Sequence, residues 1–590
     1  MRSHWKKWIA CSLCIMMIGV CVAVFAEETK TEAFTSGDFT YTLNEDGTAT
    51  ITQYSGEAAD LKIPSELDGH AVTAIGDYAF SFCSSLTSVT IPDSVTDIGS
   101  NPFIYCDVLT LITASPDHPN LAVIDGVLFS RSDKRLICYP NGLKQNSYAV
   151  PQGIQIIGDY AFSDCSSLTS VTISDSVTEI GKEAFSFCSS LTSVTIPNSV
   201  FNIGSNPFLI CDNLTRIIVS PDHPNLAVID GVLFSKPDKR LICVPKGLNK
   251  TSYAVPKGIQ IIGDRAFDDC SNLTSVTMPD SVISIGDGAF LYCSGLTSVT
   301  IPDSVTAIGN SAFAACFSLT SVAIPGSVIF IGDSTFSRCT SLTSVTIPDS
   351  VISIGHGAFL YCSSLTSVII PDSVTSIGDS AFSDCSSLTS VAIPDSVSFI
   401  GSNPFSGCDA LSDIIVSPDH PNLAVIDGVL FSKPDKRLIC VPKYLMAPSY
   451  DVPQGIQIIG DYAFCDCSVL TSVTIPDSVT SVGDSAFSDC SSLASVTIPD
   501  SVTAIGGSAF SYCFSLTSVT IPDSVTAIGD SAFSFCFSLT SITVPDSVTA
   551  IGDSAFDSCP DLTLIVPRGS YAAQYCMDNN LPYAYPDALN

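Results

Sequence analysis

Hydrophobic and polar positions repeat with a period of 23 residues along most of this chain. Residues 370–391 read IPDSVTSIGDSAFSDCSSLTSV, and the neighbouring stretches differ from this one by few letters. Seventeen cysteines mark the copies, each with a phenylalanine three residues before it and a leucine three residues after it. Because a coil this short cannot bury its own apolar side, the period predicts a solenoid stabilised by the stacking of its coils.

Within one coil, the alternation of side chains predicts a short strand. Leu296, Val299 and Ile301 fit the L-x-x-L-x-L pattern of leucine-rich repeats. Since successive side chains of a strand point to opposite faces, Val299 and Ile301 should face the core, while Ser298 and Thr300 should face solvent.

The rest of the coil predicts a second, shorter extended segment. Pro302 should end the first strand because it cannot donate a backbone hydrogen bond, and Val305 and Ile308 should return to the core. We expect Gly309 to adopt a positive φ, which glycine tolerates best. Each coil should thus contain two β segments and no long helix, around one continuous apolar core. That core should include Phe290, Cys293, Leu296, Val299, Ile301 and their equivalents.

Three insertions interrupt the period. The cysteine spacing rises to 59 between Cys106 and Cys165, and the same happens from 211 to 270 and from 408 to 467. Each insertion contains SPDHPNLAVIDGVLFS, in which Asp-Gly lies between apolar alternations, a strong signal for a β-hairpin. We interpret each as a β-meander that continues the stack as a wider coil. They are called insert 1 (near 115–157), insert 2 (220–262) and insert 3 (417–459).

The pattern I-P-x-x-V-x-x-I-G-x-x-A-F-x-x-C-x-x-L-x-x-V resembles the BspA-type leucine-rich repeat of secreted and surface proteins from bacteria and some protozoa. The resemblance implies a mainly β fold: a curved, right-handed leucine-rich-repeat solenoid of 23-residue coils with three wider coils. Residues 76–566 would form this solenoid. Residues 27–75 are similar to the family's N-terminal β cap and residues 567–590 to its C-terminal cap, with a helix expected at 570–579.

The first 26 residues have the pattern of a secretory signal peptide. Arg2, Lys6 and Lys7 precede an apolar run that ends in Val24-Phe25-Ala26, which suits cleavage before Glu27. An uncleaved N-terminal helix is the alternative. The rest of the chain has no second apolar stretch of about 18 residues, so we expect a mature chain without a transmembrane span. The expected location is secreted or cell surface.

The charge of the chain is strongly negative, at −34. This charge argues against nucleic-acid partners and against passive binding to anionic lipid, because both carry negative charge themselves. Fourteen of the 21 Lys and Arg residues after residue 26 fall in the inserts, so the surface should alternate between acidic and basic bands.

The residue types that often carry chemistry have structural explanations here. The seventeen periodic cysteines should be buried thiols that act as small apolar side chains, and we expect most of them to be reduced. His118, His223 and His420 recur in an S-P-D-H-P-N turn with no third partner that would suggest a metal site.

The columns of aspartates that follow each proline should cap turns; Asp349, Asp372 and Asp395 are examples. Weak calcium binding along this column is the alternative. The chain has no G-x-S-x-G nucleophile motif and no glycine-rich phosphate loop. We therefore expect no enzyme activity, no catalytic or metal site and no cofactor.

The repeated outward strand positions are the candidate binding site. The expected function is an exported, adhesin-like scaffold that binds an extracellular protein or glycan, where the adhesive role is implied by the resemblance. A structural cell-envelope protein that assembles side by side is the alternative. If recognition lies in the inserts instead, it should involve Lys239, Arg240, Lys436 and Arg437. The candidate face consists of Ser298, Thr300, Ser344, Thr346, Ser472, Thr474, Ser518 and Thr520.

Overall fold

The structure is a computed structural model that describes residues 32–443 and 447–588, and the chain divides into two compact units. The expected signal peptide, residues 1–26, lies outside the described residues. No helix in the described ranges is long and apolar enough to cross a membrane. Unit 1 comprises residues 32–146, 150–167 and 176–185, and unit 2 comprises 147–149, 168–175, 186–443 and 447–588.

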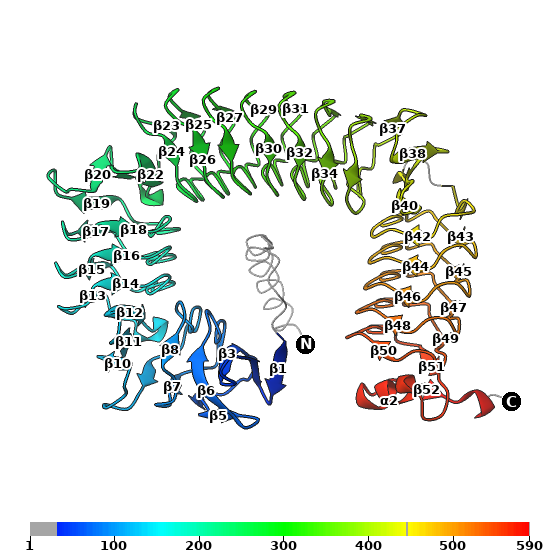
Figure 1. Cartoon of the computed structure of the whole chain (residues 1–590), viewed down its shortest axis with the longest axis horizontal. Coiled ribbons are helices and arrows are strands. Elements are labelled where there is room, and N and C mark those ends of the chain that lie inside the picture. The colour runs from blue at the N-terminus through cyan, green and yellow to red at the C-terminus, as the bar shows by residue number, and fades with distance from the viewer. Residues whose placement is uncertain (1–31, 444–446, 589–590) are drawn as a thin grey trace. The chain divides into compact units, whose positions relative to one another are not determined.

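Unit 1 begins with antiparallel strands and continues with parallel ones (Figure 1). β1, β2 and β3 form antiparallel pairs, β3 pairs in parallel with β6, and β6 with β8. β4, β7 and β9 form a separate parallel sheet. The bounds are β1 Ala33–Ser36, β2 Phe39–Leu43, β3 Ala49–Tyr54, β4 Asp60–Lys62, β5 Glu66–Leu67, β6 His70–Ile75, β7 Ser88–Thr90, β8 Asp97–Ile98 and β9 Leu111–Thr113.

Every insert contains the predicted meander. In insert 1, β10 pairs antiparallel with β11 around Asp125-Gly126, and β11 pairs antiparallel with β12. β12 then pairs in parallel with β14, so the meander joins the stack of coils as predicted. The bounds are β10 Leu121–Ile124, β11 Val127–Ser130, β12 Arg135–Cys138, β14 Ile156–Ile157 and β16 Glu179–Ile180 in insert 1 and the coil after it; β20 Leu226–Ile229, β21 Val232–Ser235 and β22 Arg240–Cys243 in insert 2; and β38 Leu423–Ile426, β39 Val429–Ser432 and β40 Arg437–Cys440 in insert 3.

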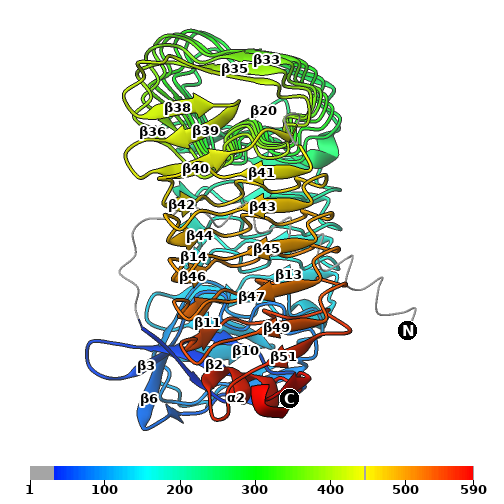
Figure 2. The same ribbon diagram turned by 90° about the vertical axis from the view of Figure 1, so that its right-hand side faces the viewer.

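In unit 2, the described coils contribute their longer β segments to three parallel sheets. Equivalent residues of neighbouring coils pair directly, as Ser275 does with Ser298. Figure 2 shows the strands from β41 to β51 one below another. The bounds are β13 Ser147–Ala149, β15 Ser170–Thr172, β17 Ser193–Ile196, β19 Arg216–Val219, β23 Ser252–Ala254, β25 Ser275–Thr277, β27 Ser298–Thr300, β29 Ser321–Ala323, β31 Ser344–Thr346, β33 Ser367–Ile369, β35 Ser390–Ile393, β37 Asp413–Val416, β41 Ser449–Asp451, β43 Ser472–Thr474, β45 Ser495–Thr497, β47 Ser518–Thr520, β49 Ser541–Thr543, β51 Thr563–Ile565 and β52 Tyr583–Ala584.

The shorter β segments of these coils also pair in parallel with those of neighbouring coils, in several separate sheets. Each has only two residues, one of which is buried, as in Ala307–Ile308. The predicted coil with two short β segments is therefore confirmed. The bounds are β18 Asn202–Ile203, β24 Ile261–Ile262, β26 Ser284–Ile285, β28 Ala307–Ile308, β30 Phe330–Ile331, β32 Ser353–Ile354, β34 Ser376–Ile377, β36 Phe399–Ile400, β42 Ile458–Ile459, β44 Ser481–Val482, β46 Ala504–Ile505, β48 Ala527–Ile528 and β50 Ala550–Ile551.

A helix follows the last coil of unit 2, as expected for residues 570–579. α2 spans Tyr571–Asp578, and its N-cap Ser570 accepts the N–H of Ala573 at 3.1 Å. Ala573 and Cys576 are buried and belong to the same apolar cluster as the preceding coils. Short 3₁₀ turns lie at Asn141–Leu143, Lys246–Leu248 and Pro586–Ala588.

The residues predicted to face the core are buried. Phe290, Cys293 and Leu296 are fully buried, while Val299 and Ile301 are 8% and 7% exposed. The phenylalanines of successive coils stack on one another; the rings of Phe290 and Phe313 are 5.1 Å apart and 2° from parallel. The predicted assignment of inward and outward positions is therefore confirmed.

The expectation of one continuous core is wrong, because in unit 2 insert 3 separates two apolar clusters. Side chains of β39 alternate between them: Leu430 belongs to the cluster that precedes the insert, whereas Val429 and Phe431 belong to the cluster that follows it. All four residues of β39 are buried, unlike the half-exposed strands of ordinary coils. The meander is thus a partition with one core on each face.

The expectation that Gly309 has a positive φ is also wrong. Gly309 lies outside the set of glycines with positive φ, and it is needed for close packing instead. A Cβ at this position would lie 2.4 Å from Oδ1 of Asp287 in the preceding coil. The left-handed positions of this coil are Ser311 (φ 54°) and Ala315 (φ 56°).

The aspartates after each proline do not cap turns as expected. The turn at Asp349 is closed by the backbone, since Val351 N–H donates to Pro348 O at 3.0 Å. The carboxylates of Asp349, Asp372 and Asp395 are exposed and accept no hydrogen bond within the described part of the chain. This column is therefore not required for the turn.

Candidate binding surface

The predicted face lies on two sheets of unit 2. Ser298 and Thr300 are on β27 and Ser344 and Thr346 on β31, while the other four residues are on β43 and β47. All eight are exposed except Ser472, which is half-buried. β29 lies between β27 and β31, and β45 lies between β43 and β47. The predicted residues therefore come from every second strand of each sheet.

The two sheets differ in how complete their hydroxyl face is. On the sheet from β23 to β37, the threonine column is broken by Ala323 and by Ile369, which is 81% exposed. On the sheet from β41 to β52, four consecutive strands keep both hydroxyls. This continuous surface, called the hydroxyl face, consists of Ser472, Thr474, Ser495, Thr497, Ser518, Thr520, Ser541 and Thr543.

Other hydroxyl columns are occupied by bonds between coils. Thr503 Oγ1 donates to the carbonyl of Thr480 at 3.3 Å, and Ser501 Oγ donates to that of Val479 at 2.5 Å. In contrast, no side chain of the hydroxyl face makes a hydrogen bond to any residue that the structure describes. Its hydroxyls are therefore available to a partner, and sequence alone could not separate them from the occupied columns.

The basic residues of the inserts are mostly engaged within the fold. Arg240 binds Asp238 at 2.9 Å and donates to the carbonyl of Ile203 at 3.2 Å. Arg437 makes the same contacts in insert 3, with Asp435 and the carbonyl of Ile400. These arginines connect the meander to the preceding coil, which weakens the alternative that they form the recognition site. Lys239 and Lys436 are exposed at the turn.

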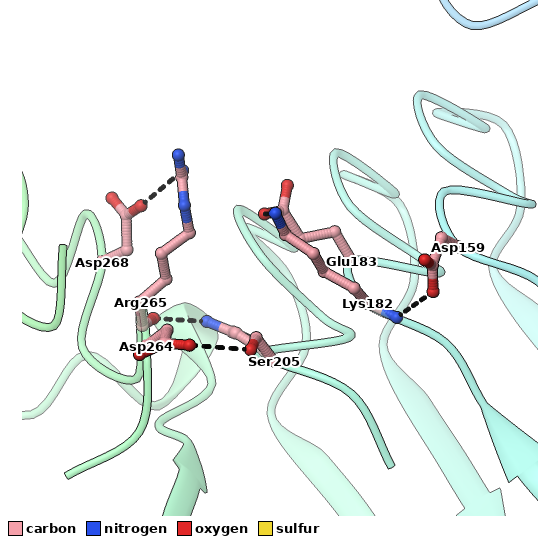
Figure 3. Close-up of polar contacts among 8 residues, drawn as sticks. Asp159, Lys182, Glu183, Ser205, Asp264, Arg265 and Asp268 are labelled. Atoms are coloured by element: carbon pink, nitrogen blue, oxygen red, sulfur yellow. Dashed lines mark hydrogen bonds and ion pairs between the residues drawn. The ribbon is translucent and has the colours of Figure 1, made fainter. Parts of the chain in front are cut away.

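Each insert is also bridged by an asparagine that the sequence analysis did not single out. The coil before each insert reads G-S-N-P-F, and Asn206 Nδ2 donates across 59 residues to the carbonyl of Arg265 at 2.7 Å. Asn403 does the same with Tyr462 at 2.8 Å. Figure 3 shows the neighbouring contact of Ser205 Oγ with Asp264 at 3.1 Å. Ordinary coils have D-S-A where the coils before the inserts have S-N-P. This change of sequence is the signal from which the asparagine bridge could have been predicted.

Polar side chains also stabilise the coils next to these bridges. Arg265 binds the buried carboxylate of Asp268 at 3.1 Å (Figure 3). In unit 1, Oδ1 of Asp159 accepts the backbone N–H of Lys182 at 2.6 Å, one coil further on. Contacts of the latter kind recur in several coils, as from Asp287 to Asn310 and from Asp530 to Asp553, and explain the aspartate that often follows Ile-Gly.

The recurring histidines are buried structural groups. Nδ1 of His223 accepts the backbone N–H of Asn225 and of Leu226 at 3.2 and 3.1 Å, so the proton lies on Nε2, which donates to Pro197 O at 3.1 Å. Burial, and to a lesser extent Lys236, lowers the pKa of His223. Within the described residues, no group of three or more His, Cys, Asp or Glu could hold a metal ion.

The periodic cysteines are hydrogen-bond donors as well as apolar groups. Cys293 Sγ donates to the carbonyl of Phe267 at 3.1 Å, and Cys316 Sγ to that of Phe290 at 3.2 Å. Burial raises the pKa of Cys339 to about 12, which keeps the thiol protonated and unreactive. This column therefore serves the stacking of coils.

The repeats match a known family of leucine-rich repeats. A family model described as BspA type leucine rich repeat region (6 copies) matches residues 53–148, 136–253, 246–362, 330–436 and 444–563. The chain belongs to this family. The resemblance noted in the sequence is thus confirmed, and the scaffold is a BspA-type leucine-rich repeat solenoid.

Several solved structures are similar to this BspA-type protein. A leucine rich cell surface protein from Faecalibacterium prausnitzii A2-165 is 26% identical over 93% of this chain and 98% of its own, with a TM-score of 0.28. A leucine-rich repeat protein from Eubacterium ventriosum is 22% identical over 67% of this chain and 98% of its own, with a TM-score of 0.42. The pneumococcal vaccine antigen PcpA is 16% identical over 94% and 98%, with a TM-score of 0.36. A search of curated proteins found no match.

Proposed function

We propose that this protein is exported and acts as an adhesin-like scaffold that binds an extracellular protein or glycan through the hydroxyl face. The observation that carries the proposal is the unbroken set of eight hydroxyls on β43–β49 whose side chains have no partner among the described residues. The N-terminal signal pattern and the family's secreted and surface members support export.

A face of this kind favours many weak contacts over one strong contact. Serine and threonine lose little side-chain entropy on binding, and each hydroxyl can donate and accept. The parallel register places equivalent hydroxyls one coil apart, as Thr497 and Thr520 are. An extended or clustered partner could therefore contact several coils at once, and avidity would multiply a modest affinity per coil.

The proposal is tested by blocking the hydroxyl face with long cationic side chains. Changing Thr474, Thr497, Thr520 and Thr543 to Lys should abolish binding of the fluorescently labelled protein to an array of immobilised glycans and purified extracellular proteins. These positions are exposed and make no side-chain bond, so the melting temperature should remain nearly unchanged.

A charge-matched control carries Lys at Thr480, Thr503, Thr526 and Thr549, which lie in the same coils but in the occupied column. This control should still bind. If both variants bind as the unmodified protein does, the hydroxyl face is not the recognition site. If the unmodified protein binds nothing and forms filaments or bundles by light scattering, the side-by-side envelope role applies instead.

A further inference from the structure

Four aromatic side chains near the end of unit 2 form two short stacks; Tyr512, Phe514 and Phe537 are exposed, and Phe535 is half-buried. The rings of Tyr512 and Phe535 lie 4.6 Å apart, those of Phe514 and Phe537 5.3 Å apart, and both pairs are within 4° of parallel. Edge contacts at 6.1 and 6.2 Å join the two stacks. These four residues, called the aromatic quartet, include Phe537, whose side chain is 48% exposed.

The fold does not need these rings. Tyr512 and Phe535 have φ values of 59° and 57°, a left-handed conformation that is costly for bulky residues. The same column holds Asp489 and Ser558 in the flanking coils, with the same backbone conformation. In the column of Phe514 and Phe537, the preceding coil has Ser491. The rings are therefore exposed or half-buried apolar groups kept at positions where smaller residues suffice.

All charged residues in the coils around the quartet are acidic. Residues 447–567 contain thirteen aspartates and no Glu, Lys, Arg or His. Two copies of this surface would repel each other, which opposes self-association through the rings. A cationic partner, in contrast, would be attracted.

A hollow next to the quartet combines a ring with a carboxylate. It has a volume of about 350 Å³ and is lined by Phe537, Asp557, Ser558, Pro560 and Leu581, together with Phe556 and Cys559. Asp557 is exposed, and its carboxylate has no partner among the described residues. A guanidinium group suits such a site, because it can stack on an aromatic face and bind a carboxylate through two N–H groups at once.

The chain itself contains an example of this contact. Arg338 and Tyr361 occupy the same column as Tyr512 and Phe535, one coil apart from each other. The guanidinium of Arg338 lies over the ring of Tyr361, 5.6 Å from its centroid. Rings in this column are therefore accessible to a guanidinium from the neighbouring coil.

We propose that the aromatic quartet and Asp557 form a docking site for an arginine-bearing segment of another protein. The site is separate from the hydroxyl face, so it goes beyond the function proposed above. Long-range attraction by the acidic coils would bring the segment to the surface, and the rings with Asp557 would hold its guanidinium groups.

The test uses a fluorescein-labelled deca-arginine peptide and measures its affinity by fluorescence anisotropy. Changing Tyr512, Phe514, Phe535 and Phe537 to Ser leaves the net charge unaltered, so general electrostatic attraction remains. Because each contact of a cation with a ring is of modest strength, we expect about tenfold weaker binding. Serine occurs at both columns in adjacent coils, so the variant should fold.

Phe317→Ser is the matched control, since Phe317 is an exposed ring in the column of Phe514 but lies outside the quartet. It should bind the peptide as the unmodified protein does. Asp557→Asn should weaken binding, and deca-lysine should bind less tightly than deca-arginine because it lacks a planar guanidinium.

Three results would each overturn the proposal. The quartet variant could bind deca-arginine as tightly as the unmodified protein. The unmodified protein could self-associate in sedimentation experiments through the quartet. It could instead bind a neutral oligosaccharide such as maltoheptaose in a quartet-dependent way. None of these results bears on whether the threonine-to-lysine variant loses binding through the hydroxyl face. The two proposals can therefore fail independently.

Discussion

At the scale of single residues, each insert has one position whose side chain lies between two aspartates. Whether that side chain is a lysine decides whether the negative charge of the two aspartates is neutralised. Lys246 of insert 2 binds Asp212, which precedes the insert, at 2.8 Å and also binds Asp269, which follows it. Lys443 of insert 3 bridges the equivalent pair, Asp409 and Asp466. The equivalent residue in insert 1 is Asn141, so Asp107 and Asp164 lack this cation. Burial and the hydrogen-bonded Asp107 carboxyl raise the pKa of Asp164 to about 7.

This difference predicts an effect of pH on unit 1. The ordinary pKa of Asp is 3.8, so between pH 4 and 7 the folded state holds more protons at Asp164 than the unfolded state does. The free energy of unfolding of unit 1 should therefore fall as the pH rises through this range. Asn141→Lys should reduce that fall, measured by hydrogen exchange at pH 5 and 7.5.

The converse substitution provides the control. Lys246→Asn removes the cation from insert 2 and should introduce the same pH dependence there, while unit 1 remains unchanged. If the Asn141→Lys variant had the same pH profile as the unmodified protein, Asp164 would not govern this response.

At the scale of elements, the inserts depend on a neutral histidine. His223 must keep Nδ1 unprotonated to accept two backbone N–H groups, and its ring is fully buried. The cationic group of Lys236 lies nearby, since its Nζ donates to the carbonyl of His223 at 2.6 Å. Protonation of the ring would therefore remove two hydrogen bonds and place a second positive charge beside the first.

Acidification should loosen insert 2. The pKa of His223 is lowered in the folded state, so the unfolded state takes up a proton first as the pH falls below about 6.5. The stabilisation is complete above that pH and is lost below it. Hydrogen exchange of residues 220–235, corrected for intrinsic rates, should show less protection at pH 5.5 than at pH 7.5. His223→Gln should abolish this difference; equal protection of the unmodified insert at both pH values would contradict the prediction.

The sequence predicted the coil well because alternation and period act within a single chain segment. It correctly placed Val299 inward, Thr300 outward and a hairpin at Asp230-Gly231. It failed where the neighbouring coil decides the outcome. Gly309 is required by the backbone of Asp287, and the hydroxyls of Thr503 and Thr520 differ in that only Thr503 finds a carbonyl acceptor in the preceding coil. Such contacts depend on stacking register, which a one-dimensional pattern does not contain.

At the scale of the whole molecule, the inserts set the limits of cooperative units within unit 2. Coils between inserts share one apolar cluster, and in that cluster stacked phenylalanines run from Phe267 to Phe405. Insert 3 ends this cluster because alternate side chains of its central strand, β39, belong to the cluster before the insert and to the cluster after it. In a linear stack, coupling passes only through nearest neighbours, so a partition of this kind should interrupt it.

A pair of cavity substitutions tests this partition. Phe359→Ala removes a fully buried ring from the cluster before insert 3 and should cost about 3–5 kcal/mol. Protection from hydrogen exchange should then fall across residues 259–416 but remain normal in residues 456–576. Phe487→Ala, in the cluster after insert 3, should give the reverse pattern. Because both substitutions remove the same ring from the same column, any difference between them reflects position alone. Loss of protection on both sides of insert 3 in either variant would mean that the meander transmits coupling, and that the two cores unfold as one.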